Sequence, residues 1–298
     1  MRKVIDDAFL SILDARDLKI RDPMNGLFGG NRRSKTYGSS AEFADFREYI
    51  PGDDLRRIDW NLYARFEKLF LRLYVDERQL HHRIYIDGSA SMDWGEPNKS
   101  DVALKIAAAL GYLGVGAMDR VSYYAIHKKH CKPLAPTITG REAYYRAVEK
   151  LNNLEFYGNG DIGTAITTDP ELGHGDGVSF IISDFLSDTN WKDAVDQLLF
   201  HKREVHLVQV LSPDEVTPAL TGKLFMLDSE ADYEEDRRNH RIDVTRTAVK
   251  AYQEAFAWHR KDITDFCASR KVGFISVCSD ESIERMLFQK ATEAEIIL

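Results

Sequence analysis

From residue 83 onwards, short apolar runs alternate with longer segments that have helical periodicity. Strands alternating with helices require crossover connections, and these produce a mainly parallel sheet with helices on both faces. We therefore predict an α/β fold with a doubly wound, mainly parallel sheet. The predicted strands are 83–87, 120–127, 177–185, 204–212 and 272–279, and the predicted helices are 99–118, 140–154, 191–202, 244–270 and 281–289.

The first 80 residues lack this alternation. Apolar and acidic residues are interleaved over residues 1–20, which predicts an amphipathic helix, not a secretory signal. Residues 26–40 are rich in Gly, Ser and basic residues and are predicted to form an exposed loop. We expect residues 1–80 to be an N-terminal extension packed on a main domain formed by residues 81–298.

Composition excludes several classes of protein. A net charge of −8 over 298 residues argues against a general binder of nucleic acid or of anionic membranes, because both need a basic face. No segment approaches 18 uncharged apolar residues, so we predict no membrane span. Cys131, Cys267 and Cys278 show no CxxC spacing, which indicates buried thiols in a reducing compartment and no zinc site. We expect a cytoplasmic protein.

Two predicted strands end in an aspartate. Asp87 ends the first strand and is followed by Ser89 and Ser91, while Asp184 ends a later strand. In open parallel sheets, ligands bind beyond the carboxyl ends of the strands, where the strand order reverses. Two carboxylates and two hydroxyls form an all-oxygen set that suits Mg²⁺ or Mn²⁺ and not Zn²⁺. The alternative is that these polar residues only cap neighbouring helices.

The same residues carry a family resemblance. "DGSASM" (87–92) resembles the DxSxS signature of the von Willebrand factor A fold and its metal-ion-dependent adhesion site. Residues 41–87 resemble the prokaryotic domain-of-unknown-function family fifty-eight, whose members carry a von Willebrand A-like domain. The match continues through "DRVSYYAI", "SDF", "VLSPDE" and "LDSE". The resemblance implies a sheet of the von Willebrand A (Rossmann-like) type.

The resemblance also implies a ligand set and a partner. Asp87, Ser89 and Ser91 match the first metal loop completely, and Asp184 matches the aspartate at the end of the later strand. Members of this family are commonly encoded beside MoxR-type AAA+ ATPases, so the resemblance implies such an ATPase as the partner. The chain contains no P-loop, so any ATP hydrolysis must come from that partner.

The second metal loop departs from the family pattern. Related domains usually have a threonine in a "GGT" turn, and "GNGDIGTAI" (158–166) has Gly160 at that position. Asp161 is a tentative replacement ligand, either directly or through water, whereas Thr164 would need a shifted loop. A Gly160→Thr substitution should tighten metal binding if the loop follows the usual path. It should strain the turn if Gly160 has a positive φ angle.

Other polar segments allow two interpretations each. Residues 49–60 contain three aspartates near two arginines. One interpretation is an acidic metal site. The other is a capped turn with internal ion pairs, which has a partner-binding or interdomain role. His127 and His130 flank a predicted turn, where solvated side chains are expected. Met92 and Trp94 follow the metal loop and belong either to an interface or, respectively, to the core and a helix end.

Two functions are compatible with these features. The first is a non-enzymatic, metal-dependent protein-binding module that acts as an adaptor of a MoxR-type AAA+ ATPase in protein remodelling or complex maturation. The second is a metal-dependent phosphoester hydrolase that uses the same strand-end cleft. A hydrolase also needs a base or nucleophile and a cationic group, for which Lys99 or an arginine from residues 56–65 is a candidate.

Overall fold

The computed structural model describes residues 4–14, 43–74, 79–169, 177–187, 190–218, 222–226, 240–282 and 285–290. The predicted loop over residues 26–40 lies outside the described residues. The chain divides into two compact units, one formed by residues 24–79 and the other by residues 1–23 and 80–298. The expectation that residues 1–80 form a single extension packed on the main domain stays a prediction.

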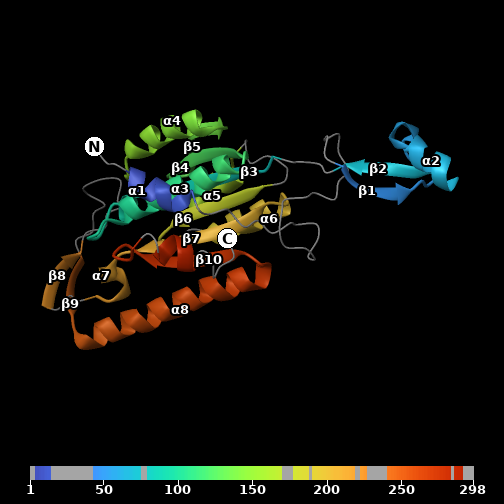
Figure 1. Cartoon of the computed structure of the whole chain (residues 1–298). Coiled ribbons are helices and arrows are strands. Elements are labelled where there is room, and N and C mark those ends of the chain that lie inside the picture. The colour runs from blue at the N-terminus through green and yellow to red at the C-terminus, as the bar shows by residue number, and fades with distance from the viewer. Residues whose placement is uncertain are drawn as a thin grey trace. The chain divides into compact units, whose positions relative to one another are not determined.

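The larger unit is built on a six-stranded sheet with the order β10-β7-β6-β3-β4-β5 (Figure 1). Neighbouring strands are parallel except for β5, which is antiparallel to β4. This topology confirms the predicted doubly wound, mainly parallel sheet. The strands are β3 (His81–Asp87), β4 (Arg120–His127), β5 (His130–Ile138), β6 (Val178–Ser183), β7 (Glu204–Leu211) and β10 (Gly273–Cys278).

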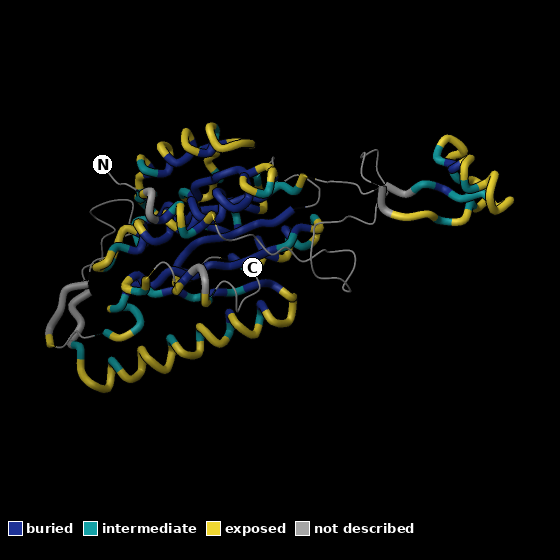
Figure 2. Tube along the Cα trace, in the orientation of Figure 1, coloured by how far each residue is buried: buried dark blue, intermediate teal, exposed yellow. Residues whose placement is uncertain are grey.

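Helices cover both faces of this sheet, and the central strands are buried except at the start of β3, where His81 is partly buried (Figure 2). Apolar side chains of α1 (Asp7–Leu13), α3 (Lys99–Gly116) and α4 (Arg141–Asn152) share one core with one face of the strands. Side chains of α5 (Ile162–Thr167), α6 (Trp191–Phe200) and α8 (Arg246–Arg270) share a second core with the opposite face. Continuous apolar strands are therefore explained by burial on both sides.

Helix α3 connects β3 to β4 and is the most deeply buried helix of the described residues. Asn98 caps it, since the Asn98 side chain accepts a hydrogen bond from the backbone N–H of Ser100. Gly111 lies against the hydroxyl of Tyr123, where a Cβ atom would overlap that oxygen. Small residues along α3 thus allow the helix to approach the sheet closely.

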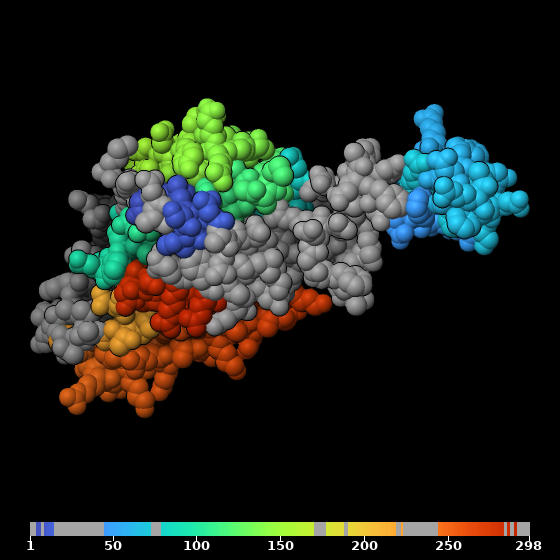
Figure 3. Space-filling model, viewed as in Figure 1, coloured from blue at the N-terminus to red at the C-terminus, as the bar shows by residue number. Residues whose placement is uncertain are grey.

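Helix α8 runs along the outside of the same unit (Figure 3). It is 25 residues long, but of its residues only Ile263 and Cys267 are buried. The other residues of α8 are exposed or partly exposed, which explains why this long helix has a strongly polar sequence. None of the helices among the described residues is long and apolar enough to cross a membrane.

Several short elements were not predicted. They include β5, the antiparallel pair β8 (Gly222–Met226) and β9 (His240–Val244), α5 and the single-turn helix α7 (Pro213–Val216). The predicted closing helix is a π-helical segment over Arg285–Lys290.

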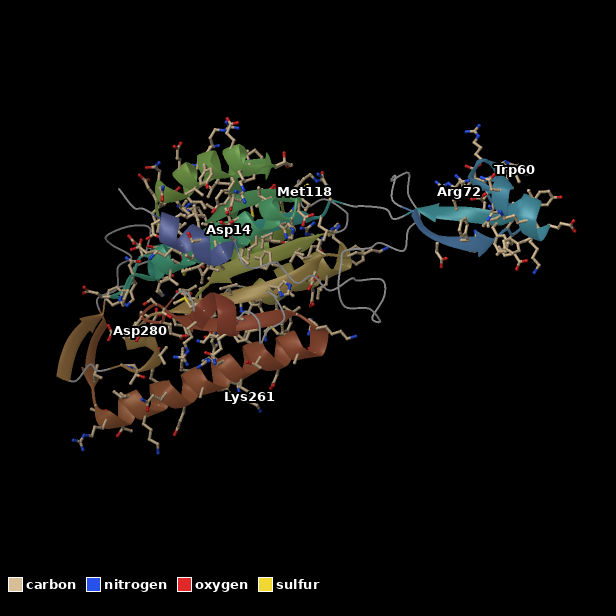
Figure 4. All side chains as sticks on the ribbon, viewed as in Figure 1. Asp14, Trp60, Arg72, Met118, Lys261 and Asp280 are labelled. Carbon is tan, nitrogen blue, oxygen red and sulfur yellow. The ribbon has the colours of Figure 1, made fainter. Side chains whose placement is uncertain are left out.

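The smaller unit contains an antiparallel pair of strands, β1 (Phe43–Glu48) and β2 (Phe70–Tyr74), joined through a 3-10 turn (Leu55–Arg57) and α2 (Trp60–Phe66). Its core is small, consisting of Ile58 and Leu71 with partly buried Tyr49 and Leu69. Asp59 caps α2 and also pairs with Arg72. The side chains of Trp60 and Arg72 are both labelled in Figure 4.

Candidate functional site

Asp87 and Asp184 lie at the carboxyl ends of adjacent strands. After β3 the chain crosses through α3 to β4 on one side, and it later returns to β6 on the other side of β3. The strand order therefore reverses between β3 and β6, which is where open α/β sheets bind ligands. The sequence analysis predicted only that the two aspartates end different strands, and the structure places those strands side by side.

The carboxylate of Asp87 is buried, with 2% of the residue exposed. Its Oδ1 accepts a hydrogen bond from the backbone N–H of Ser89 (3.0 Å), and its Oδ2 accepts one from the Ser183 hydroxyl (2.6 Å). Burial, together with the charge of Asp184, raises the pKa of Asp87 to about 6. No cationic side chain among the described residues forms a salt bridge with Asp87, so its negative charge is uncompensated.

The two serines lie beside this carboxylate. Ser89 is buried, and its hydroxyl is 3.0 Å from the hydroxyl of Ser91, which is half-buried. The loop is fixed against the second loop by a hydrogen bond from the backbone N–H of Ala90 to the carbonyl of Gly158. Asp87, Ser89 and Ser91 therefore form a compact group of oxygen atoms at the strand end.

Gly160 is in direct contact with the Asp87 carboxylate. A Cβ atom at position 160 would lie 2.5 Å from Asp87 Oδ1 and 3.5 Å from the Cβ of Ser89. Gly160 is not among the glycines with positive φ, so its backbone conformation is open to other residues. The obstacle to a side chain here is the contact with Asp87, and the absence of a threonine leaves room for that carboxylate.

Asp161 has a local role. It is the N-cap of α5: its Oδ1 accepts a hydrogen bond from the backbone N–H of Thr164 (2.9 Å), and its Oδ2 accepts one from the Thr164 hydroxyl (2.7 Å). Both carboxylate oxygens are thus engaged in capping, which satisfies helix donors that would otherwise lack partners. The proposal that Asp161 replaces the missing threonine as a ligand gains no support from these contacts.

Asp184 is paired with a buried lysine. Lys99 Nζ lies 2.8 Å from Asp184 Oδ2 and 2.6 Å from Glu215 Oε1, and the lysine is fully buried. Burial disfavours the ammonium, but the charges of Asp184 and Glu215 outweigh it, and the pKa of Lys99 is raised. The other oxygen of Asp184 accepts a hydrogen bond from the backbone N–H of Leu186 (3.1 Å).

Sequence reasoning named Lys99 only as a possible cation for hydrolysis and did not identify Glu215. One signal was available: "SPDE" (212–215) has the spacing of a capping box, and Ser212 and Glu215 form one at the start of α7. That signal fixes the position of Glu215 but not its partner, because Lys99 and Glu215 are 116 residues apart.

The structure bears on three more predictions near the site. His127 was expected to be solvated, and this is wrong: its ring stacks on Tyr157 with centroids 4.3 Å apart, and it covers Gly88, where a Cβ atom would overlap the ring. Met92 is buried in the core. Trp94 is 57% exposed, as an interface residue would be.

The aspartates of residues 49–60 form caps and ion pairs. Asp53 pairs with Arg47 (2.7 Å), Asp54 caps the 3-10 turn, and Asp59 caps α2 and pairs with Arg72. These contacts favour the second interpretation of this segment, a capped turn with internal ion pairs.

Asp87, Ser89 and Ser91 supply part of the ligand set that one hard divalent cation needs. Among the described residues, no group of three or more His, Cys, Asp and Glu side chains is arranged to hold a metal ion. However, Asp87 contributes a buried and uncompensated carboxylate, and Ser89 and Ser91 contribute hydroxyl oxygens next to it. This donor set suits Mg²⁺ or Mn²⁺, with Asp184 held beside it by Lys99.

The chain matches a known protein family. The model of the family described as "Protein of unknown function DUF58" matches residues 45–262, most of the chain. The chain belongs to the DUF58 family.

This DUF58 protein has relatives in mycobacteria. Two of them, "Uncharacterized protein Rv1480" of Mycobacterium tuberculosis and "Uncharacterized protein Mb1516" of Mycobacterium bovis, are each 28% identical over 305 aligned positions that cover 93% of this chain and 94% of the relative.

Solved structures with similarity include two that are only distantly alike. The SpRpn10 VWA domain matches with a TM-score of 0.37 and 10% identity, over 69% of this chain and 92% of that one. Manganese-loaded Plasmodium vivax TRAP protein matches with a TM-score of 0.32 and 14% identity, over 44% of this chain and 57% of that one.

Proposed function

We propose that this DUF58 protein is a non-enzymatic protein-binding module whose strand-end site holds Mg²⁺ or Mn²⁺ and binds an acidic side chain of a partner. The observation that carries the proposal is the buried Asp87 carboxylate, which has serine hydroxyls beside it and no cationic partner among the described residues. A bound divalent cation supplies a coordination position that a partner's carboxylate can complete.

The chain's own residues provide the remaining parts of such a site. Ser183 and the backbone of Ser89 orient the Asp87 carboxylate, and Gly160 keeps space free beside it. Trp94 is exposed close to the loop in sequence and offers an aromatic contact of the kind enriched at interfaces. The acidic net charge of the chain would repel an acidic partner, so a cation is what makes such contact favourable.

We further propose that the partner is a MoxR-type AAA+ ATPase and that this protein acts as its adaptor in protein remodelling or complex maturation. The support is the family resemblance, together with the absence of a P-loop from this sequence.

Metal-dependent stability tests the site. Thermal unfolding of the full chain is measured in Mg²⁺, in Mn²⁺ and in chelator, for the wild type, Asp87→Ala and Ser91→Ala. Ligand binding to the folded state alone adds about 2.7 kcal/mol at a ligand concentration of 100 Kd. We expect a metal-dependent rise in melting temperature that both substitutions reduce.

Ser91→Ala is the cleaner variant, because Ser91 is half-buried and its hydroxyl pairs only with Ser89 among the described contacts. Ser269→Ala, on the exposed surface of α8, is the matched control and should respond to metal like the wild type. A wild-type melting curve that is indifferent to millimolar metal and to chelator would contradict the proposed cation site.

Partner binding is tested with the purified MoxR-type ATPase of the same organism. We expect binding in Mg²⁺ that Ser91→Ala and chelator both weaken, and the Ser91→Ala result carries the test because chelator also removes the Mg²⁺ that the ATPase needs for ATP. Asp184→Ala is a poor probe, because it leaves the buried Lys99 with Glu215 alone. Binding that survives chelator and Ser91→Ala would place the interface elsewhere, with residues 41–65 as the next candidate.

A second candidate function, metal-dependent phosphoester hydrolysis at the same site, is favoured by one observation. His127 packs on Gly88, next to Asp87, and its buried Nδ1 has no hydrogen-bond partner among the residues that the structure describes. An imidazole at that position is a candidate general base. Phosphatase and nuclease substrates with Mg²⁺ and Mn²⁺ test this, and activity that is lost in His127→Gln would favour the hydrolase over the binding module.

A further inference from the structure

Lys99 occupies an unusual position for a lysine. It is the first residue of α3, where the helix macrodipole favours negative and not positive side chains. It is also fully buried, which lysine side chains almost never are unless they are paired. Both local preferences oppose a lysine here, so its place depends on its two tertiary partners, Asp184 and Glu215.

Those two partners are themselves fixed. Glu215 is held by the capping box of α7, in which its Oε2 accepts a hydrogen bond from the backbone N–H of Ser212 (2.7 Å). Asp184 is held by the backbone N–H of Leu186, and its carbonyl accepts a hydrogen bond from Gln209 (2.9 Å). Each carboxylate therefore presents one oxygen to the ammonium from a rigid support.

The charges at the strand ends follow from these contacts. In their ionised forms Asp87, Asp184 and Glu215 carry three negative charges, and Lys99, in contact with two of these carboxylates, cancels one of them. Two negative charges remain, which one divalent cation neutralises. The ammonium contacts Asp184 Oδ2 and the backbone N–H of Leu186 contacts Oδ1, so the ammonium would repel a metal ion that approached Asp184.

We propose that Lys99 is a built-in counter-cation that positions Asp184 and keeps it from direct metal coordination. It thereby limits the site to one divalent cation on the Asp87 loop and weakens the affinity for that cation. This inference deepens the proposed function and rests on it, because it concerns the same cation site. Lys99 is a positioning residue in this scheme, since it is fully buried and the hydrogen bonds of its ammonium to described residues are to two carboxylates.

A purely structural role for Lys99 makes a different prediction. If the lysine only ties α3 to β6 and α7, then its removal destabilises the fold and leaves metal affinity unchanged. If it is a counter-cation, then its removal leaves the buried Asp184 and the partly buried Glu215 without their ammonium partner, and a divalent cation can replace the lost charge. The response of metal affinity therefore separates the two roles.

The test uses two measurements on the full chain. Calorimetry monitors a titration with Mn²⁺ alone, and thermal unfolding is measured in Mn²⁺ and in chelator. The variants are Lys99→Met and, as the matched control, Lys192→Met, whose ion pair with Asp262 is partly exposed. We expect Lys99→Met to melt lower than the wild type in chelator and to bind Mn²⁺ at least about tenfold more tightly, because a nearby positive charge is removed. Lys192→Met should bind Mn²⁺ like the wild type.

A second variant covers the case in which Lys99→Met does not fold. Glu215→Gln keeps a side chain that can complete the capping box but removes one negative charge, so Lys99 is left to Asp184 alone. We expect several-fold weaker Mn²⁺ binding, whereas a purely structural role predicts no change. Lys99→Met with wild-type or weaker affinity, or Glu215→Gln with wild-type affinity, overturns the inference.

The outcomes also separate this inference from the proposed function. A wild type that binds Mn²⁺, with Lys99→Met unchanged, refutes the counter-cation and leaves the cation site standing. A wild type that does not bind, with Lys99→Met gaining affinity, supports the counter-cation and refutes a metal-dependent function for the natural protein. If neither binds, both are wrong.

Discussion

A single methyl group at position 160 should disturb the strand-end site. The Cβ atom of an alanine would lie 2.5 Å from Asp87 Oδ1, whereas ordinary van der Waals contact is 3.4–4 Å. The Asp87 carboxylate cannot yield freely, because Ser89 and Ser183 hold both of its oxygens and the residue is buried. Gly160→Ala is therefore an overpacking substitution and not a change in backbone strain.

The expected cost can be bounded in two ways. Forcing an extra methyl group into a packed site costs about 1–3 kcal/mol. If the carboxylate instead moves away, it loses hydrogen bonds to a charged group, which contribute about 1.5–3 kcal/mol each. The protein adopts the cheaper response, so we expect a loss of about 1–3 kcal/mol, and Gly160→Thr should weaken metal binding instead of restoring it.

Urea unfolding of the full chain in chelator measures this loss, and a double-mutant cycle assigns it to the contact. Asp87→Ala removes the oxygen that the new methyl group meets, so adding Gly160→Ala to that background should cost much less than it does in the wild type. A loss below about 0.5 kcal/mol, or an equal loss in both backgrounds, would refute the reasoning. Tighter metal binding by Gly160→Thr would refute it as well.

Three further predictions concern the fold around the site. Gly111→Ala should destabilise the protein by at least about 1–3 kcal/mol, because the added Cβ atom overlaps the Tyr123 hydroxyl. The control is Gly116→Ala, whose Cβ atom meets nothing within 4 Å, so this variant should be neutral or stabilising. Equal urea midpoints for the two variants would contradict this prediction. Burial and the charges of three arginines lower the pKa of His81 to about 3. The His81 imidazole therefore binds a proton more tightly in the unfolded chain than in the folded protein. The free energy of unfolding should fall as the pH drops from about 6.5 towards 3. His81→Gln should show a smaller difference between pH 7 and pH 5, and an unchanged difference would exclude His81 as the cause. Ser183→Ala removes a donor to Asp87 and an acceptor for a backbone N–H, and should cost about 1–3 kcal/mol in urea unfolding; a neutral result would mean that another group takes over.

The sequence by itself determined the buried strands of the sheet and the placement of two aspartates. Strands β3 and β6 contain short apolar runs over residues 84–86 and 180–182 because they are buried on both faces, and polar residues follow each run at the strand end. Local patterns of this kind need no knowledge of distant residues. The position of Asp87, Ser89 and Ser91 on one loop followed for the same reason, as did the turn between β4 and β5.

Edge elements were missed because they lack a local signal. Strand β5 is mostly exposed and contains Pro133 and Pro136, which is tolerated at the edge of a sheet but resembles a loop in sequence. Strands β8 and β9 form a separate two-stranded sheet of five residues each. Such strands are defined by their pairing and not by a continuous apolar pattern.

The electrostatic character of the site was decided only by the tertiary structure. Lys99 meets Glu215 across 116 residues of sequence, and His127 covers Gly88 through the return of β4 to the strand end. Local propensity could not predict that Lys99 is buried and paired at this site, because the start of a helix and a fully buried position both disfavour a lysine. What makes the arrangement favourable is the meeting of one ammonium and two fixed carboxylates in a buried place, and that depends on how three distant segments pack.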